Sequence, residues 1–146
     1  MESSQIEILL VEDDIDDAEM TIHAMRKHNL GNKLIHVTDG EEAMDFLLGR
    51  GKFTGRDVSL TPRLILLDLK MPKMDGMEVL EMVKSNASTK KIPVVILTSS
   101  NEDPDVSRCY ELGANGYIVK PVEFDSFIVA VSELGMYWML LNHAPA

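Results

Sequence analysis

The most constraining feature of the chain is the stretch from Leu64 to Gly76, which reads LILLDLKMPKMDG. It begins as a continuous run of branched apolar residues, the pattern of a parallel strand that is buried on both faces. Asp68 lies where this run ends, and Met-Pro and Asp-Gly pairs then force a loop. Ligands of open α/β sheets bind beyond the carboxyl ends of the strands, so Asp68 is well placed for chemistry. An isolated aspartate at a strand end more often only caps a loop, so the rest of the chain must decide.

Short apolar runs and helical patterns alternate along the whole chain. Besides the central run, strands are expected at residues 6–11, 33–37, 92–97 and 116–119. Such alternation implies βαβ units and a parallel sheet with helices on both faces. Right-handed crossovers and a flavodoxin-like strand order, 2-1-3-4-5, bring the ends of the first and third strands together. The predicted fold class is therefore α/β, a doubly wound five-stranded parallel sheet.

Polar residues stand at the ends of four of these strands. They are Glu12 and Asp13, Asp68, Thr98 and Lys120. Carboxylates that converge in one cleft repel one another unless a cation intervenes, and Mg²⁺ suits carboxylate ligands that are completed by phosphate oxygens. The ammonium and the hydroxyl can contact the other oxygens of a phosphoryl group. Because a carboxylate that attacks phosphorus needs this neutralisation, the pattern predicts an aspartyl-phosphate site with Mg²⁺ as cofactor.

Each of these residues also has an ordinary structural explanation. A lone Thr98 is usually a strand residue, a lone Lys120 is usually solvated, and Tyr117 alone suggests packing. Asp16 and Asp17 are assigned to the start of a helix, where acids interact favourably with the helix dipole. The functional interpretation is preferred because four strands would otherwise have to end by accident in the residue types that one reaction requires.

Composition limits the classes of partner. The 146 residues fit one domain, and a formal net charge of −10 argues against a nucleic-acid-binding surface. The single cysteine, Cys109, excludes an internal disulfide and suits a reducing compartment. Neither a signal peptide nor an apolar run long enough to cross a bilayer is evident. We therefore expect a soluble, cytoplasmic protein without nucleic-acid or membrane partners.

In combination, four motifs resemble one known family. They are Val-Glu-Asp-Asp at Val11–Asp14, Asp-x-x-Met-Pro-x-Met-Asp-Gly at Asp68–Gly76, Thr98 at a strand end, and Lys120-Pro121 at the last strand end. This pattern is similar to the receiver domain of bacterial two-component response regulators of the CheY-like type, over roughly residues 7–134. The resemblance implies phosphorelay signalling, with a sensor histidine kinase as the phosphoryl donor. It implies no enzymatic activity beyond the domain's own phosphorylation and dephosphorylation.

The resemblance also implies a role for each site residue. Asp68 is the expected phosphoacceptor, Glu12 and Asp13 the acidic pair that holds Mg²⁺, and the backbone carbonyl of Lys70 a further metal ligand.

The remaining implied roles concern the response to phosphorylation. Thr98 is the expected switch hydroxyl, Tyr117 the switch aromatic and Lys120 the phosphate-binding lysine. A cis peptide bond is expected before Pro121, which the residue type permits.

The C-terminal segment departs from an ordinary receiver domain. Residues 1–134 are expected to form the receiver, and residues 135–146, which begin GMYWMLLN, an apolar extension. A large apolar patch usually marks an interface, and a two-fold homodimer is its default form. We expect dimerisation through this extension and the face of the fourth helix, fifth strand and fifth helix; folding back onto the domain is the alternative. Three features resemble the single-domain regulators that are paired with bacterial phytochrome kinases. They are the extension, the 49–62 loop and the sequence DLKMP that begins at Asp68.

Three other functional classes share parts of this pattern. A haloacid-dehalogenase-type phosphatase needs a second aspartate two residues after its nucleophile, where this chain has Lys70. A flavodoxin-like cofactor carrier needs a phosphate-cradling loop after the first strand, where Glu12 and Asp13 would repel phosphate. A scaffold receiver that is never phosphorylated remains the main alternative.

Overall fold

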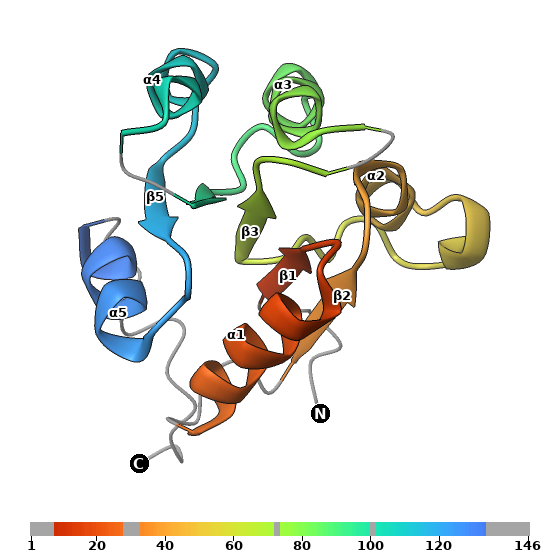
Figure 1. The fold of residues 1–146 in the computed structure, drawn as a ribbon. Helices are drawn as coiled ribbons and strands as arrows, with labels where there is room; N and C mark the ends of the chain where they lie inside the picture. Colours follow the sequence, from red (N-terminus) through yellow and green to blue (C-terminus); the bar gives the residue numbers. More distant parts are fainter. Residues whose placement is uncertain (1–7, 28–32, 72–73, 100–101, 134–146) are drawn as a thin grey trace.

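The computed structural model describes residues 8–27, 33–71, 74–99 and 102–133, in which strands and helices alternate (Figure 1). The strands are β1 (Ile8–Val11), β2 (Leu34–Val37), β3 (Leu64–Asp68), β4 (Val94–Thr98) and β5 (Gly116–Val119). The α-helices are α1 (Ile15–Lys27), α2 (Gly40–Leu48), α3 (Gly76–Ser85), α4 (Pro104–Glu111) and α5 (Phe124–Glu133). Every expected strand and helix is present. β4 starts at Val94, two positions after the predicted start, because Pro93 has no N–H to give to a sheet.

The five strands form one parallel sheet in the order β2-β1-β3-β4-β5, which confirms the predicted topology. Helices α1 and α5 cover one face of the sheet, and α2, α3 and α4 cover the other (Figure 1). The carboxyl ends of β1 and β3 therefore lie side by side at the point where the strand order reverses. In folds of this kind that point is where ligands bind.

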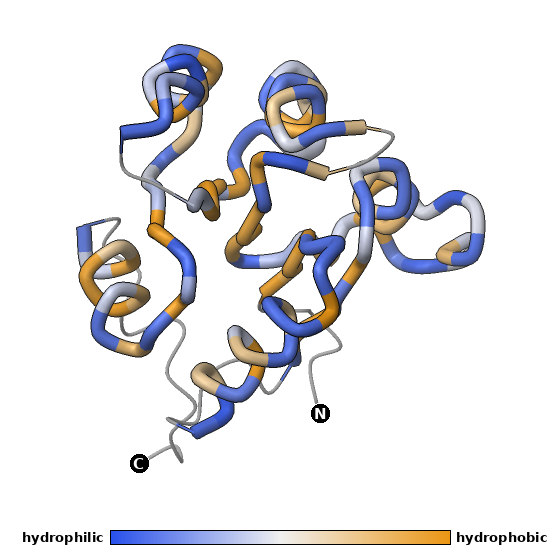
Figure 2. The backbone as a smooth tube through the Cα atoms, in the orientation of Figure 1, coloured by the Kyte–Doolittle hydropathy of each residue, from blue (hydrophilic) through white to orange (hydrophobic). Residues whose placement is uncertain are grey.

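Alternation along the strands divides the core into two layers. In β1, Ile8 and Leu10 pack with Phe127 on the side of α1 and α5, whereas Leu9 and Val11 pack on the opposite side. Figure 2 shows hydrophobic residues concentrated in the strands, whereas along the helices hydrophobic and hydrophilic residues alternate. Because the central strands are buried on both faces, their backbones give the site a fixed frame.

Aspartates fix where three helices begin. Asp39 accepts the N–H of Glu42 at 2.8 Å at the start of α2, and Asp75 accepts that of Glu78 at 3.0 Å at the start of α3. Asp103 caps α4 in the same way. Such a cap contributes about 1 kcal/mol relative to alanine. Through these caps the sequence sets where α2, α3 and α4 leave the site edge of the sheet.

The expectation that residues 49–62 form only a loop is wrong in one respect. A short 3₁₀ helix, η1 (Gly51–Phe53), interrupts the segment. Arg56 then ties the loop to α2, with its guanidinium 4.0 Å from the centre of the Phe46 ring and its Nε donating to the Phe46 carbonyl at 2.7 Å. A polar composition does not reveal this packing, because an arginine in such a loop is normally solvated.

Some expectations fall outside the described residues. These are the start of the first strand at residue 6 and the conformation of the 135–146 extension. Among the helices that the structure describes, none has the length and hydropathy needed to cross a bilayer.

Candidate functional site

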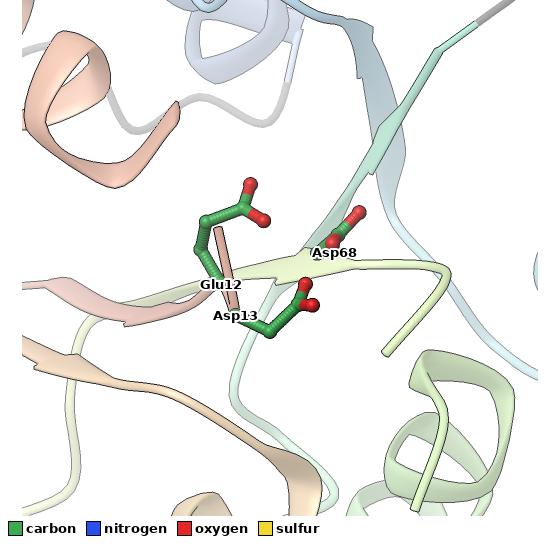
Figure 3. Close-up of side chains that lie close together, drawn as sticks. All are labelled: Glu12, Asp13 and Asp68. Carbon is green, nitrogen blue, oxygen red and sulfur yellow. The ribbon is translucent and has the colours of Figure 1, made fainter. Parts of the chain in front are cut away.

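Strand register brings the predicted acids together. Val11 in β1 pairs with Leu67 in β3, so the next residues along the two strands, Glu12 and Asp68, are level at the sheet edge. Asp13 follows in the turn that leads into α1. Figure 3 shows the three carboxyl side chains gathered beyond the ends of β1 and β3. The site is thus a direct consequence of parallel pairing between two buried apolar strands.

The three carboxylates form a group that could hold a metal ion. One oxygen from each of Glu12, Asp13 and Asp68 lies within 4.8 Å of the others. Glu12 is fully buried, Asp68 is 4% exposed, and Asp13 is exposed. Two acids are therefore held away from water while the third lies open to solvent, which leaves an entry path for a hydrated cation.

Lys120 brings the opposite charge to the same place. Its backbone N–H donates to the Thr98 carbonyl at 2.7 Å, which fixes the end of β5 beside the end of β4. Its Nζ lies 3.2 Å from Glu12 Oε1 and 3.3 Å from Asp68 Oδ1. The peptide bond between Lys120 and Pro121 is cis, as the resemblance implied. The ammonium thus bridges two of the predicted metal-site acids.

The positive charge of Lys120 does not fully compensate the negative charge of the site's carboxylates. Burial, and then the neighbouring Glu12, raise the pKa of Asp68 to about 7, although Lys120 acts in the opposite direction. Burial alone would lower the pKa of Lys120, but the charges of Asp68 and Glu12 outweigh it and hold that pKa above its ordinary value. Further positive charge at the site would therefore stabilise the ionised form of Asp68.

These observations fit a divalent cation with hard oxygen ligands. The acids line a pocket of about 260 Å³, into which Lys70, Thr98 and Lys120 also open. A small ion with several water ligands and a phosphoryl group can share such a space, and Mg²⁺ commonly combines one or two carboxylates with phosphate oxygens. The donor set and its excess negative charge both match this class of ion.

The structure places Thr98 in the pocket and Tyr117 outside it. Thr98 is buried, and its hydroxyl makes a long contact of 3.5 Å with Asp103 Oδ2 at the start of α4. Tyr117 is 37% exposed and lies edge-on to Tyr110, with 6.3 Å between ring centroids. The pair lies on the α4–β5–α5 face. The predicted switch residues therefore each contact α4 or its cap, Thr98 through Asp103 and Tyr117 through Tyr110.

Three acids that line this pocket, Asp14, Asp17 and Asp103, were not predicted as site residues. Asp17, which sequence reasoning assigned to the helix dipole, also lies 3.2 Å from Lys120 Nζ. Asp103 lies 3.9 Å from Lys70 Nζ as well as near Thr98. The available signal for Asp17 was its place in the first turn of the helix that follows Glu12 and Asp13. Asp103 gave no comparable signal.

Comparison with known proteins identifies the family. The model of the response regulator receiver domain matches residues 8–132, and the chain belongs to this family. Among curated relatives, a probable methanogenesis regulatory protein, FilR2 of Methanothrix harundinacea, is 38% identical over 94% of this chain and 86% of its own. Response regulator Rcp1 of Synechocystis is 38% identical over 95% and 92%.

Solved structures give the same family. The bacteriophytochrome response regulator RtBRR is 49% identical, with a TM-score of 0.86, over 97% of this chain and 84% of its own. The Mn²⁺-bound form of Rcp1 is 37% identical, with a TM-score of 0.74, over 97% and 99%. The phosphorylated cyanobacterial phytochrome response regulator RcpA is 34% identical, with a TM-score of 0.75, over 97% and 99%.

The chain is thus a response regulator receiver, a class of signalling protein. Neither family membership nor geometry favours the alternatives. A scaffold receiver does not need acids, lysine and threonine to converge in one pocket, as they do here. Lys70 occupies the position where a dehalogenase-type phosphatase needs its second aspartate. Its side chain is 72% exposed, and its Nζ lies 3.9 Å from Asp103 Oδ2.

Proposed function

We propose that Asp68 accepts a phosphoryl group and that the receiver uses this modification as its signal. The observation that carries the proposal is the position of the Asp68 carboxylate, which is level with Glu12 and in contact with Lys120 Nζ in a polar pocket. A nucleophilic carboxylate and an ammonium that can receive a phosphoryl oxygen are thereby held together. The phosphorylated structure of the related RcpA supports the same chemistry here.

Glu12, Asp13 and Asp68 would hold Mg²⁺, together with the backbone carbonyl of Lys70. The Mn²⁺-bound structure of the related Rcp1 supports a divalent ion at this place. When bound, such an ion supplies positive charge to the non-bridging oxygens of the phosphoryl group and to the Asp68 carboxylate.

The residues of the chain then have distinct tasks. An oxygen of Asp68 forms a bond to phosphorus while the bond from phosphorus to the donor nitrogen breaks, and the departing imidazole takes up a proton from water. Lys120 Nζ, which already touches Asp68 Oδ1, is placed to take over a phosphoryl oxygen. The Thr98 hydroxyl in the same pocket is placed to donate to another. The chain would catalyse only its own modification.

The response would follow from Thr98 and Tyr117. Phosphorylation adds about two negative charges and three acceptor oxygens. If Thr98 then donates to the phosphoryl group, its contact with Asp103 on α4 is lost, and Tyr117 can leave its exposed position beside Tyr110. This shift between two states would remodel the α4–β5–α5 face.

The function is tested with the purified chain and acetyl phosphate, followed by intact-mass analysis. We expect a single phosphoryl adduct when Mg²⁺ is present and none when EDTA replaces it, because the repulsion among the carboxylates is then unrelieved. An intact, folded chain that gains no adduct under either condition would contradict the proposal and favour the scaffold alternative.

The phosphoryl donor would be a phosphohistidine on a sensor kinase, and a cytoplasmic location follows from that partnership. The resemblance to RtBRR, Rcp1 and RcpA supports a bacterial phytochrome kinase. FilR2, which is named for methanogenesis, is as similar in sequence to this chain as Rcp1 is. Phosphoryl transfer from different kinases must therefore be compared. Faster transfer from a phytochrome kinase than from an unrelated sensor kinase is the expected result.

Residues 1–134 would act as the receiver and residues 135–146 as a dimerisation element. The apolar composition of the extension supports this division, as does a surface of the receiver on which large hydrophobic side chains are exposed. On that surface, Val129 of α5 is 59% exposed, and Tyr110 and Tyr117 lie beside it. A two-fold dimer through the α4–β5–α5 face and the extension would cover these side chains.

Deletion of residues 135–146 is expected to convert a dimer into a soluble monomer. The reason is the loss of most of the apolar area that the second copy would bury. Sedimentation velocity measures the change directly, and circular dichroism checks that the truncated receiver is folded. Equal sedimentation coefficients, corrected for mass, in the full and truncated chains would contradict the proposed role of residues 135–146 in dimerisation.

A further inference from the structure

The ammonium of Lys120 is surrounded by three carboxylates. Its Nζ lies 3.2 Å from Glu12 Oε1, 3.3 Å from Asp68 Oδ1 and 3.2 Å from Asp17 Oδ2. A lysine ammonium has three N–H donors and no acceptor, so these contacts match its full donor capacity. Two of the three partners belong to the candidate metal group, but Asp17 does not.

Asp17 is held on a rigid part of α1. Its backbone N–H donates to Asp14 Oδ1 at 3.0 Å, and its carbonyl accepts from the Thr21 hydroxyl at 3.0 Å. The next residue, Ala18, is buried against the core. The backbone is therefore fixed, and the side chain reaches from the helix toward the sheet edge with 40% of its surface exposed.

We propose that Asp17 is a positioning residue that holds the Lys120 ammonium in place for phosphoryl transfer. The inference rests on the proposed phosphorylation of Asp68. During that reaction an oxygen of Asp68 becomes bonded to phosphorus, and Glu12 is engaged with the metal ion. Asp17 neither reacts nor binds the metal ion. Its contact with Nζ is therefore kept throughout the reaction and holds the ammonium beside the incoming phosphoryl oxygens.

Loss of this contact leaves the lysine more freedom. Its four-carbon side chain has many rotamers, and without Asp17 the two remaining carboxylate contacts of the ammonium are both with acids of the metal group. A catalytic group displaced by about 1 Å can cost up to two orders of magnitude in rate. Since Lys120 keeps two of its three partners in the resting state, we expect a smaller effect, a loss of about tenfold in the maximal rate of phosphorylation.

The chain offers a closely matched control. Asp16 precedes Asp17 in the first turn of α1 and carries the same charge near the same helix terminus. It is exposed, and its side chain makes no hydrogen bond or ion pair with the described residues. Asp16→Ala and Asp17→Ala therefore remove equal charge, but only the second removes a contact with Lys120.

The test measures initial rates of phosphorylation against acetyl phosphate and Mg²⁺ concentration. Asp17→Ala is expected to lower the maximal rate about tenfold, with an unchanged Mg²⁺ midpoint, and Asp17→Asn to recover part of the loss. In a Lys120→Ala background, Asp17→Ala should have no further effect, because the residue acts through the lysine. Melting curves establish that each variant is folded.

Two results would overturn the inference. One is an Asp17→Ala rate equal to that of Asp16→Ala, and the other is a full additional loss in the Lys120→Ala background. If either occurs while the wild-type chain is phosphorylated, the proposed function stands and only the role of Asp17 is wrong. A wild-type chain that is not phosphorylated would contradict the proposed function itself.

Discussion

Asp68→Asn is expected to lower phosphorylation by acetyl phosphate by roughly a thousandfold or more, because an amide oxygen is a very poor nucleophile. The substitution keeps the size of the side chain and an acceptor for Lys120 Nζ, so the pocket keeps its shape. Intact-mass time courses with Mg²⁺ measure the loss. Asp16→Asn, which removes the same charge from an exposed position, should react at the wild-type rate. Equal rates in wild type and Asp68→Asn would contradict the site assignment.

The same variant should not be less stable than the wild type in metal-free buffer at pH 8. Burial and Glu12 raise the pKa of Asp68 to about 7, so the folded chain holds this proton more tightly than the unfolded chain. The stability associated with that proton is present at pH 4 and is lost as pH rises through 7. Asparagine carries no charge, so Asp68→Asn should gain stability relative to wild type as pH rises from 4 to 8. Chemical denaturation at several pH values measures the difference.

Gly76→Ala is expected to destabilise the fold by about 3 kcal/mol, at the upper end of typical overpacking costs. A Cβ at Gly76 would lie 2.3 Å from the backbone oxygen of Asp68 and 2.8 Å from Leu69 Cα. Both are backbone atoms at the end of β3, and the Gly76 N–H donates to the Leu69 carbonyl at 2.9 Å. Relief of the overlap must therefore move the phosphoacceptor strand or the start of α3.

The melting temperature should fall by roughly 6–12 °C in a chain of this size. The phosphorylation rate should fall as well, because Asp68 moves with the end of β3. Gly116→Ala is the matched control, since a Cβ there meets Val95 Cγ2 at an ordinary 3.8 Å and the position lies in a strand. It should change stability by less than about 0.5 kcal/mol. Comparable destabilisation in both variants would contradict the packing account.

The fold and the convergence of Glu12, Asp13 and Asp68 were predictable because they depend on local patterns. Buried parallel strands have a near-continuous apolar signature, and each pocket residue directly follows such a run, so strand order alone brings Glu12 and Asp68 level. The helix caps at Asp39 and Asp75 are likewise local, because each carboxylate accepts an N–H only three residues further along the chain. In these cases the local preference and the tertiary structure agree.

The contacts that sequence reasoning missed depend on tertiary structure. Asp17 meets Lys120 only because the fold brings the start of α1 next to the end of β5, although the two residues are 103 positions apart in the chain. Its position at a helix start offered a sufficient local explanation, and that explanation hid the contact. Arg56 was missed for a similar reason, because its packing on Phe46 depends on the path of an irregular loop.

The most direct test of the central claim is to locate the phosphoryl group on the chain. Phosphorylated protein is treated with sodium borohydride, which reduces an acyl phosphate to an alcohol, and its peptides are sequenced by mass spectrometry. We predict a single reduced site at Asp68, formed only when Mg²⁺ was present. A reduced site at Asp13 or Asp17 instead, or a phosphate ester retained on Thr98 or Ser99, would contradict the account.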